Sequence, residues 1–311
     1  MKRKKIYSLR KAFYYLFATG FILLISAGII PAETKAQSYP GLVSLEGYNT
    51  KAYFSPGNEE RARVMALRCD NVMKYYSEFI GFTPSFTLLV LDPEDWSRFT
   101  TFPVYGMPHY SDNKTLIVAS RDNEFWRSFI PPVDGLPEDL AQDIRKTYSD
   151  GAGNLSMAPF FDLLVIHELG HAYHLQNGLN MQRLWLAELF VNIFLHTYIA
   201  EKEPEMLPAL TVFPKMVISG DRSSLKYTSL SDLENRYEEI GKNYPQNYGW
   251  YQSRWHSSAA DIYDAGGRRV ITDFWHALEN QKDDLDDSGL TRFLSERVHQ
   301  SVADVLVRWD E

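Results

Sequence analysis

The stretch Ala158-Pro-Phe-Phe-Asp-Leu-Leu-Val-Ile-His-Glu-Leu-Gly-His-Ala-Tyr-His174 predicts a long apolar helix that continues to Gly178. Side chains four residues apart lie on one face of a helix, so the imidazoles of His167 and His171 can reach one metal ion. Glu168 lies one step further round the helix, where its carboxylate can take a proton from a water molecule that the metal activates. The stretch therefore predicts a metal-binding helix, and zinc is the ion that this pattern favours.

The alternative is a buried helix whose two histidines and glutamate are satisfied by the backbone or by other side chains. Three such polar groups are costly to bury without partners, which favours a metal ion as the partner. Gly170, between the glutamate and the second histidine, lowers the stability of a helix but allows another element to approach closely. We therefore expect a neighbouring element to pack tightly at Gly170.

A third metal ligand is predicted further along the chain. A catalytic zinc takes three protein ligands and leaves a fourth position open for water. Glu188, seventeen residues after His171, is the one carboxylate in the apolar helical stretch Trp185-Leu-Ala-Glu-Leu-Phe-Val-Asn-Ile-Phe-Leu195. Asn192 lies four residues after this glutamate on the same face, where it can accept a hydrogen bond from a ligand imidazole. His167, His171 and Glu188 are thus the expected ligands of one Zn²⁺ ion.

With this ligand set, the chain resembles the gluzincin metallopeptidases, which include thermolysin and the aminopeptidase-N type. The closest likeness is to the compact bacterial domains called peptidase MA-like. Trp185-Leu-Ala-Glu188 is similar to their W-hydrophobic-x-E segment. Tyr227-Thr-Ser-Leu-Ser-Asp-Leu233 resembles their S-L-x-x-L helix start, and the stretch from Tyr251 to Gly266 resembles their Y-to-G segment. The likeness covers roughly residues 85 to 280.

Further ligand sets remain open at this point. His174 lies one turn beyond His171, and Asp261 or Asp264 would serve in a zinc enzyme that uses a later aspartate. The metzincin pattern HExxHxxGxxH is disfavoured, because its glycine position holds His174 and its last histidine position holds Asn177.

The resemblance implies an α+β fold of the zincin type. We expect a small twisted sheet in an α/β lobe over residues 37–155, then a mainly helical lobe over residues 156–311 that carries the metal site. Short apolar runs at 85–91 and 114–120 predict strands, whereas 106–113 has the composition of a turn and loop.

Two segments before the metal helix carry further expectations. In gluzincins the strand before this helix is the sheet edge on which an extended substrate pairs, and residues 115–120 are the candidate here. A plain sheet strand is the equal alternative for these residues. Residues 134–157, rich in Gly, Pro and Asp, are expected to be a loop over the cleft or a connection between the lobes.

The implied activity is zinc-dependent hydrolysis of a peptide bond. Glu168 acts as general base towards water and then as general acid towards the leaving amine. The developing oxyanion needs a hydrogen-bond donor, and the resemblance assigns this role to Tyr251. His256 is the second candidate, since a histidine has this role in thermolysin-like enzymes, and Tyr248 also remains open.

The first 36 residues are predicted to be a signal peptide. Six Lys or Arg side chains within residues 2–11 precede an apolar stretch from Ala12 to Ile30, and Thr34-Lys-Ala36 is an acceptable cleavage site. An uncleaved membrane anchor is the alternative, because the apolar stretch is nearly long enough to span a bilayer. Either way, the remaining chain is placed outside the cytoplasm, in the periplasm or secreted, since the positive charges stay inside.

Charge and cysteine content narrow the classes of partner. Without residues 1–36 the chain has 25 basic and 39 acidic residues, a formal charge of −14, which disfavours binding to nucleic acid or to an anionic membrane surface. Cys69 is the single cysteine, so no internal disulfide can form. The expected partner is a peptide or protein substrate. The rival hypothesis is a non-catalytic protein of zincin fold that binds peptides or cell-envelope partners.

Overall fold

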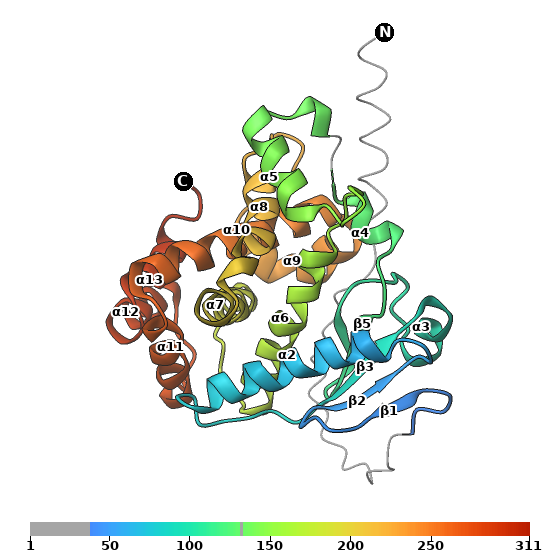
Figure 1. Cartoon of the computed structure of the whole chain (residues 1–311). Helices are drawn as coiled ribbons and strands as arrows, with labels where there is room; N and C mark the ends of the chain where they lie inside the picture. The colour runs from blue at the N-terminus through green and yellow to red at the C-terminus, as the bar shows by residue number, and fades with distance from the viewer. Residues whose placement is uncertain (1–37, 131–132) are drawn as a thin grey trace.

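The computed structural model describes residues 38–130 and 133–311. The predicted signal peptide, residues 1–36, lies outside these residues. The described chain is α+β, as predicted: a five-stranded sheet comes first and a predominantly helical region follows it (Figure 1). One continuous cluster of buried apolar side chains runs from the strands into the C-terminal helices.

The sheet is mixed, with a parallel centre and antiparallel edges. Its three central strands are β2 (Lys51–Phe54), β3 (Thr87–Leu91) and β5 (Thr115–Ala119). On one side β1 (Val43–Leu45) pairs antiparallel with β2, and on the other β4 (His109–Asp112) pairs antiparallel with β5. Every residue of β5 is buried, which is typical of a strand covered on both faces.

The expectation that residues 115–120 form the sheet edge is wrong. Ile117 pairs with Leu89 of β3 on one side and with His109 of β4 on the other. The edge is β4, within the segment 106–113 whose composition predicts a turn and loop. The physical reason is composition: β5 is buried throughout and mostly apolar, whereas β4 is short, polar and irregular at Asp112, which are features of edge strands.

The predicted helices are present around the sheet. They include the metal-motif helix α6 (Ala158–Gln176) and its successor α7 (Leu184–Lys202). A further long helix, α2 (Glu59–Ser77), buries Cys69. The other helices are α3 (Pro93–Phe99), α4 (Glu124–Ser128), α5 (Glu138–Tyr148), α8 (Leu207–Ile218), α9 (Leu230–Asn243), α10 (Pro245–Gly266), α11 (Arg269–Asn280), α12 (Asp287–Arg297) and α13 (Gln300–Val307), with short 3-10 turns η1 (Val133–Gly135) and η2 (Pro204–Met206). Helices α11 to α13 lie on the side of the molecule opposite the sheet (Figure 1).

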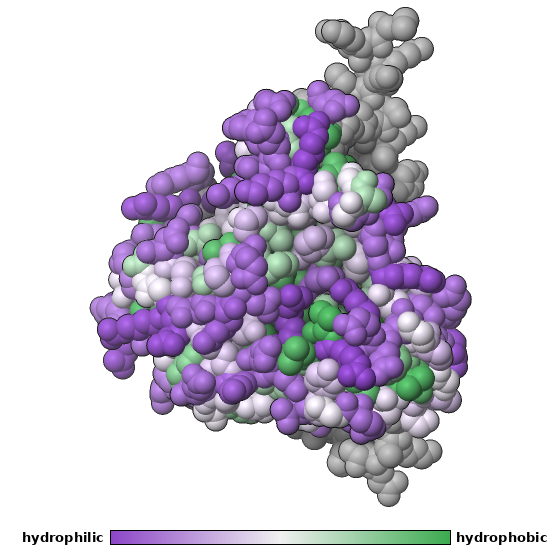
Figure 2. Space-filling model, in the orientation of Figure 1, coloured by the Kyte–Doolittle hydropathy of each residue, from purple (hydrophilic) through white to green (hydrophobic). Residues whose placement is uncertain are grey.

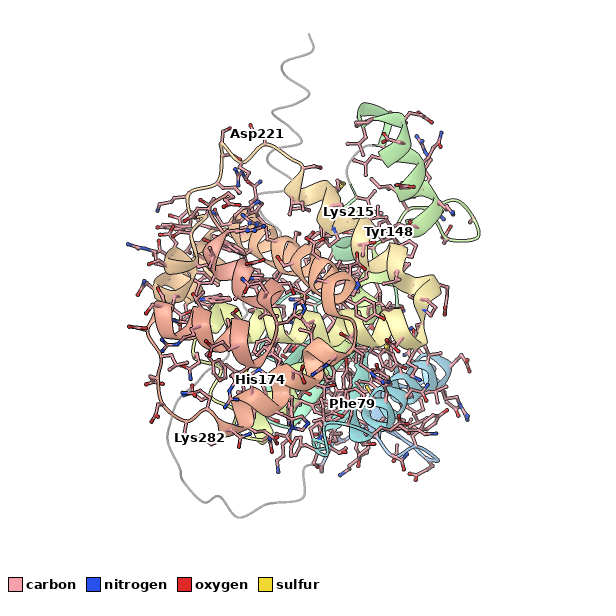
Figure 3. All side chains as sticks on the ribbon, turned by 90° about the vertical axis from the view of Figure 1, so that its left-hand side faces the viewer. Phe79, Tyr148, His174, Lys215, Asp221 and Lys282 are labelled. Atoms are coloured by element: carbon pink, nitrogen blue, oxygen red, sulfur yellow. The ribbon has the colours of Figure 1, made fainter. Side chains whose placement is uncertain are left out.

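Residues 134–157 are more ordered than their composition predicts, because they contain α5. Ala141, Ile144 and Tyr148 form one buried face of this helix. The Tyr148 hydroxyl donates to Ala209 O at 2.9 Å and accepts from the Phe213 amide at 3.1 Å, which fastens α5 to α8. Figure 3 shows Tyr148 beside the helix that carries Lys215. The glycine-rich and proline-rich residues supply the turns on either side of this helix.

Helices α6 and α7 pack closely at Gly170, as predicted. A Cβ atom at this position would lie 3.1 Å from Val191 Cβ and 3.3 Å from the ring of Phe194, closer than most side chains tolerate. The glycine therefore lets α7 approach the face of α6 that carries the histidines. Because the two helix backbones are close, side chains on their facing sides can reach one another.

Helix α2 connects the sheet to these two helices. The Arg61 guanidinium donates two hydrogen bonds to the Asp162 carboxylate of α6, at 2.6 and 2.5 Å. The Tyr76 hydroxyl donates to Phe194 O of α7 at 2.5 Å, and the two rings stack with centroids 3.7 Å apart. The metal-motif helix is thus held from the sheet side by polar as well as apolar contacts.

The described surface is largely polar. Figure 2 shows a mostly hydrophilic face on which hydrophobic side chains gather only in small patches. Within residues 38–130 and 133–311, none of the helices has both the length and the hydropathy that crossing a membrane requires.

Candidate metal centre

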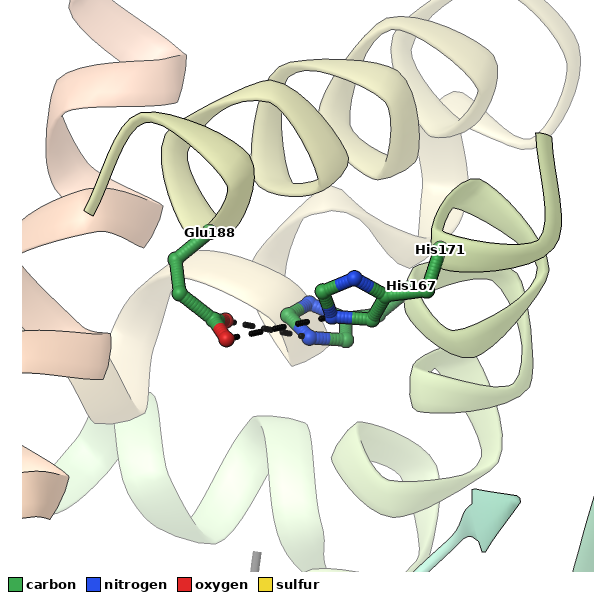
Figure 4. Close-up of side chains that lie close together, drawn as sticks. All are labelled: His167, His171 and Glu188. Carbon is green, nitrogen blue, oxygen red and sulfur yellow. Dashed lines mark ion pairs between the residues drawn. The ribbon is translucent and has the colours of Figure 1, made fainter. Parts of the chain in front are cut away.

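Three predicted ligands meet between α6 and α7 (Figure 4). His167 Nε2 lies 3.5 Å from Glu188 Oε2, and His171 Nε2 lies 3.9 Å from Glu188 Oε1. One donor atom from each residue lies within 4.8 Å of the other two. All three side chains are buried, with exposed fractions of 6 % for His167, 2 % for His171 and 4 % for Glu188.

These residues fit a zinc ion. Tetrahedral zinc with bonds of about 2.1 Å places its ligand atoms roughly 3.4 Å apart, close to the observed separations. Two imidazoles and one carboxylate are a donor set of catalytic zinc sites that keep a fourth position open. Glu188 is also buried, and a cation between these three groups would balance the negative charge of its carboxylate.

Both histidines are held in the form that binds metal. Burial and, to a smaller extent, the neighbouring His171 lower the pKa of His167 to about 4, against the opposing effects of Glu188 and Asn192. Burial lowers the pKa of His171 to about 3. Neutral imidazole has a free nitrogen lone pair, so at neutral pH each ring can donate to a metal without first losing a proton.

The far side of the His171 ring contacts His174. Their Nδ1 and Nε2 atoms lie 3.0 Å apart, so a proton on His171 Nδ1 would be donated to His174 and leave Nε2 facing Glu188. His174 is therefore behind a candidate ligand and outside the His167, His171 and Glu188 group. Asp261 and Asp264, which a zinc site with a later aspartate would use, are exposed on α10 and do not join this group either.

Asn192 lies beside the first ligand, as its spacing from Glu188 predicts. Its amide nitrogen donates to the backbone oxygen of Glu188 at 2.9 Å. The Asn192 side chain also raises the pKa of His167 against the effect of burial, which places it near that ring. The same region of α7 thus carries both a candidate ligand and a polar group close to His167.

Two residues that the sequence pattern does not identify hold the Glu188 carboxylate. The Tyr237 hydroxyl donates to Oε1 at 2.9 Å, and Gln252 Nε2 donates to Oε2 at 2.9 Å. The Gln252 amide also lies 2.9 Å from the Tyr248 hydroxyl. Gln252 follows Tyr248 by four residues on α10, a spacing that could have indicated it. Tyr237 directly follows an interruption of α9 at Arg236, which no sequence pattern marks.

Glu168 is buried next to the centre and lines a pocket together with His167. Burial raises the pKa of its carboxyl well above the usual value, and the nearby Glu188 carboxylate raises it further. Because Glu168 and His167 line the same pocket, the Glu168 carboxyl can contact a molecule held there.

The three candidate oxyanion donors lie in different places. Tyr251 does not line the pocket: its hydroxyl donates to Ser229 O at 2.6 Å, and its ring stacks on Trp309 with centroids 5.9 Å apart. His256 and Tyr248 both line the pocket with Glu168. The His256 ring centroid lies 6.4 Å from that of His167. The structure thus brings two of the three candidates to the centre and packs Tyr251 elsewhere.

The pocket beside the centre is strongly apolar. Met107, Val104 and Leu164 contribute to it, and six phenylalanines form much of the wall: Phe102, Phe125, Phe129, Phe160, Phe161 and Phe213. Its polar lining comes chiefly from His167, Glu168 and one side of α10.

Comparisons of the chain with protein-family models, with curated proteins and with solved structures found no match.

Proposed function

We propose that the protein is a zinc-dependent peptidase of the gluzincin type that acts outside the cytoplasm. The observation that carries this proposal is the meeting of His167, His171 and Glu188 at one buried point, with Glu168 beside them at the wall of a pocket. Two helices supply this arrangement from positions far apart in the sequence. The location rests on the basic and apolar composition of residues 1–36.

The roles of the residues follow from their positions. Zinc, when bound, polarises a carbonyl and lowers the pKa of water towards neutrality. His167, His171 and Glu188 would hold it, with His174 and Asn192 orienting the two rings. Glu168 would take the proton of the attacking water and pass it to the leaving nitrogen.

Tyr248 is the donor that we propose for the developing oxyanion. Its hydroxyl lies 2.9 Å from Gln252 Nε2 and 3.5 Å from the Tyr237 hydroxyl, which itself contacts Glu188. Burial raises the pKa of Tyr248 well above its usual value, so the hydroxyl keeps its proton and can donate it in a hydrogen bond. His256 is the second candidate, from its place in the same pocket.

Zinc content and turnover together test the proposal. We expect the purified protein to bind about one zinc per chain and to cleave an unfolded protein such as casein. Glu188→Ala should lose most of the zinc, because one of three ligands is removed. Glu168→Gln should keep the zinc and lose turnover, because the amide cannot accept the proton from water.

The exposed Glu205 offers a matched control, since Glu205→Ala removes a carboxylate near the end of α7 without touching the centre. Full zinc content in Glu188→Ala would contradict the ligand set. A protein that binds zinc but cleaves no peptide would leave the rival, a non-catalytic peptide-binding protein. A wild-type protein that binds no zinc would overturn the proposal altogether.

A further inference from the structure

The apolar pocket adjoins the candidate metal centre. His167 and Glu168 form part of its wall, and Phe129 and Phe213 contribute apolar rings to it. The pocket has a cavity volume of about 100 Å³. This is the same order as the roughly 150 Å³ cavity that accepts benzene in another protein. The free space therefore suits a single ring or a branched aliphatic group.

Gly241 of α9 forms part of the pocket wall. Gly241 is buried. If it carried a Cβ atom, no neighbouring side chain or other element of the described residues would lie within 4 Å of that atom. A buried glycine with open space beside it differs from Gly170, where a neighbouring helix fills the place of the side chain. The absence of a side chain at Gly241 thus leaves part of the pocket empty.

We propose that the pocket binds one large apolar side chain, the size of phenylalanine or leucine, from the substrate residue next to the scissile bond, and that Gly241 sets its depth. This inference rests on the proposed peptidase function and names the class of peptide that the centre takes. Gly241 is then a specificity-determining residue.

The lining excludes other classes of side chain. A charged or amide side chain would lose its hydration among the phenylalanines without gaining equivalent hydrogen bonds. The Ser253 hydroxyl in this wall already donates to Gly249 O at 2.8 Å. A glycine or alanine of the substrate would leave most of the apolar wall uncovered, so it would gain little from binding.

Two hydroxamates of matched chemistry test the pocket without requiring turnover. Acetohydroxamic acid and 3-phenylpropionohydroxamic acid share the metal-binding group and differ by a benzyl group. We expect the zinc-loaded protein to bind the phenyl compound about 10- to 100-fold more tightly in calorimetry, which corresponds to burial of one aromatic side chain.

The variant Gly241→Leu should abolish this preference, because the leucine side chain would occupy the space that the benzyl group needs. Leucine has a higher helix propensity than glycine, so the substitution should not weaken α9. Gly241→Ala should give an intermediate ratio, and its melting temperature checks that the fold is kept.

Equal affinities of the wild-type protein for the two hydroxamates would overturn the pocket assignment while leaving the zinc centre in place. An undiminished preference in Gly241→Leu would show that the benzyl group binds elsewhere, and would also overturn it. If neither compound binds the zinc-loaded protein, the proposed function itself fails and the inference fails with it.

Discussion

Helix α10 carries two neighbouring rows of side chains that serve different purposes. Tyr248, Gln252 and His256 follow one another at intervals of four residues and face the pocket or the Glu188 carboxylate. Tyr251 and Trp255 form the adjacent row and pack on Trp309, near the end of the chain. The same helix thus offers one row to the candidate centre and the other to the aromatic core. A displacement of three residues separates a candidate donor from a packing residue.

The largest effect should come from the packing row. Trp309 is almost fully buried, its ring contacts Trp250, Tyr251 and Trp255, and its Nε1 donates to Thr228 O at 2.7 Å. Trp309→Ala would leave a cavity in this aromatic cluster, so we expect the free energy of unfolding to fall by about 3–5 kcal/mol. Urea denaturation measures this loss, and zinc content measured below the transition should stay unchanged. If Trp309→Ala lost zinc but kept its stability, the packing row would contribute to metal binding, which contradicts the separation of the two rows.

The next effect concerns the row that faces the centre. Tyr248→Phe removes the hydroxyl proposed to donate to the oxyanion, and we expect kcat to fall by about 100- to 1000-fold with little change in melting temperature. Tyr251→Phe is the matched control on the other row. It removes the hydrogen bond to Ser229 O, so it should cost about 0.5–1.5 kcal/mol of stability and leave kcat unchanged. The opposite outcome, with kcat lost in Tyr251→Phe and kept in Tyr248→Phe, would restore Tyr251 as the donor.

This pair of tyrosines also shows what the sequence can predict about the site. Local spacing is sufficient to place His167 and His171 on one face of a helix and to predict a close approach at Gly170. It cannot choose between Tyr248 and Tyr251, because both begin rows with four-residue spacing and aromatic or polar members. The choice depends on Trp309, which lies far along the chain and covers only one of the rows.

The errors in the fold have the same origin. The apolar run at 114–120 predicts a strand, but the place of this strand in the sheet depends on pairing with β3 and β4, which a local pattern does not specify. Tyr237 reaches Glu188 only because α9 is interrupted at Arg236, so a regular helical period could not place it. Local patterns therefore predict the apolar strands β3 and β5 and the helices α6 and α7, whereas long-range contacts decide their neighbours.

The smallest effect should come from Gln252, in the row that faces the centre. Gln252 donates to Glu188 Oε2 and contacts the Tyr248 hydroxyl, so we expect it to position the carboxylate without binding the metal itself. Gln252→Met fills similar space but cannot donate. The zinc dissociation constant should rise by about 10- to 100-fold, as is typical when a partner of a ligand is removed.

Competition with a fluorescent chelator measures this constant without any need for turnover. Gln246→Met, the same substitution earlier on α10, should leave the constant unchanged, because no contact joins Gln246 to the centre in the described chain. Gln252→Glu keeps the shape of the side chain but places a second carboxylate against Glu188. If Gln252 serves to donate to Glu188, the Gln252→Glu protein without zinc should have a lower melting temperature than the wild type without zinc. The two carboxylates would repel each other at that distance. A normal zinc constant in Gln252→Met would instead assign the residue to packing and leave Tyr237 as the group that holds the carboxylate.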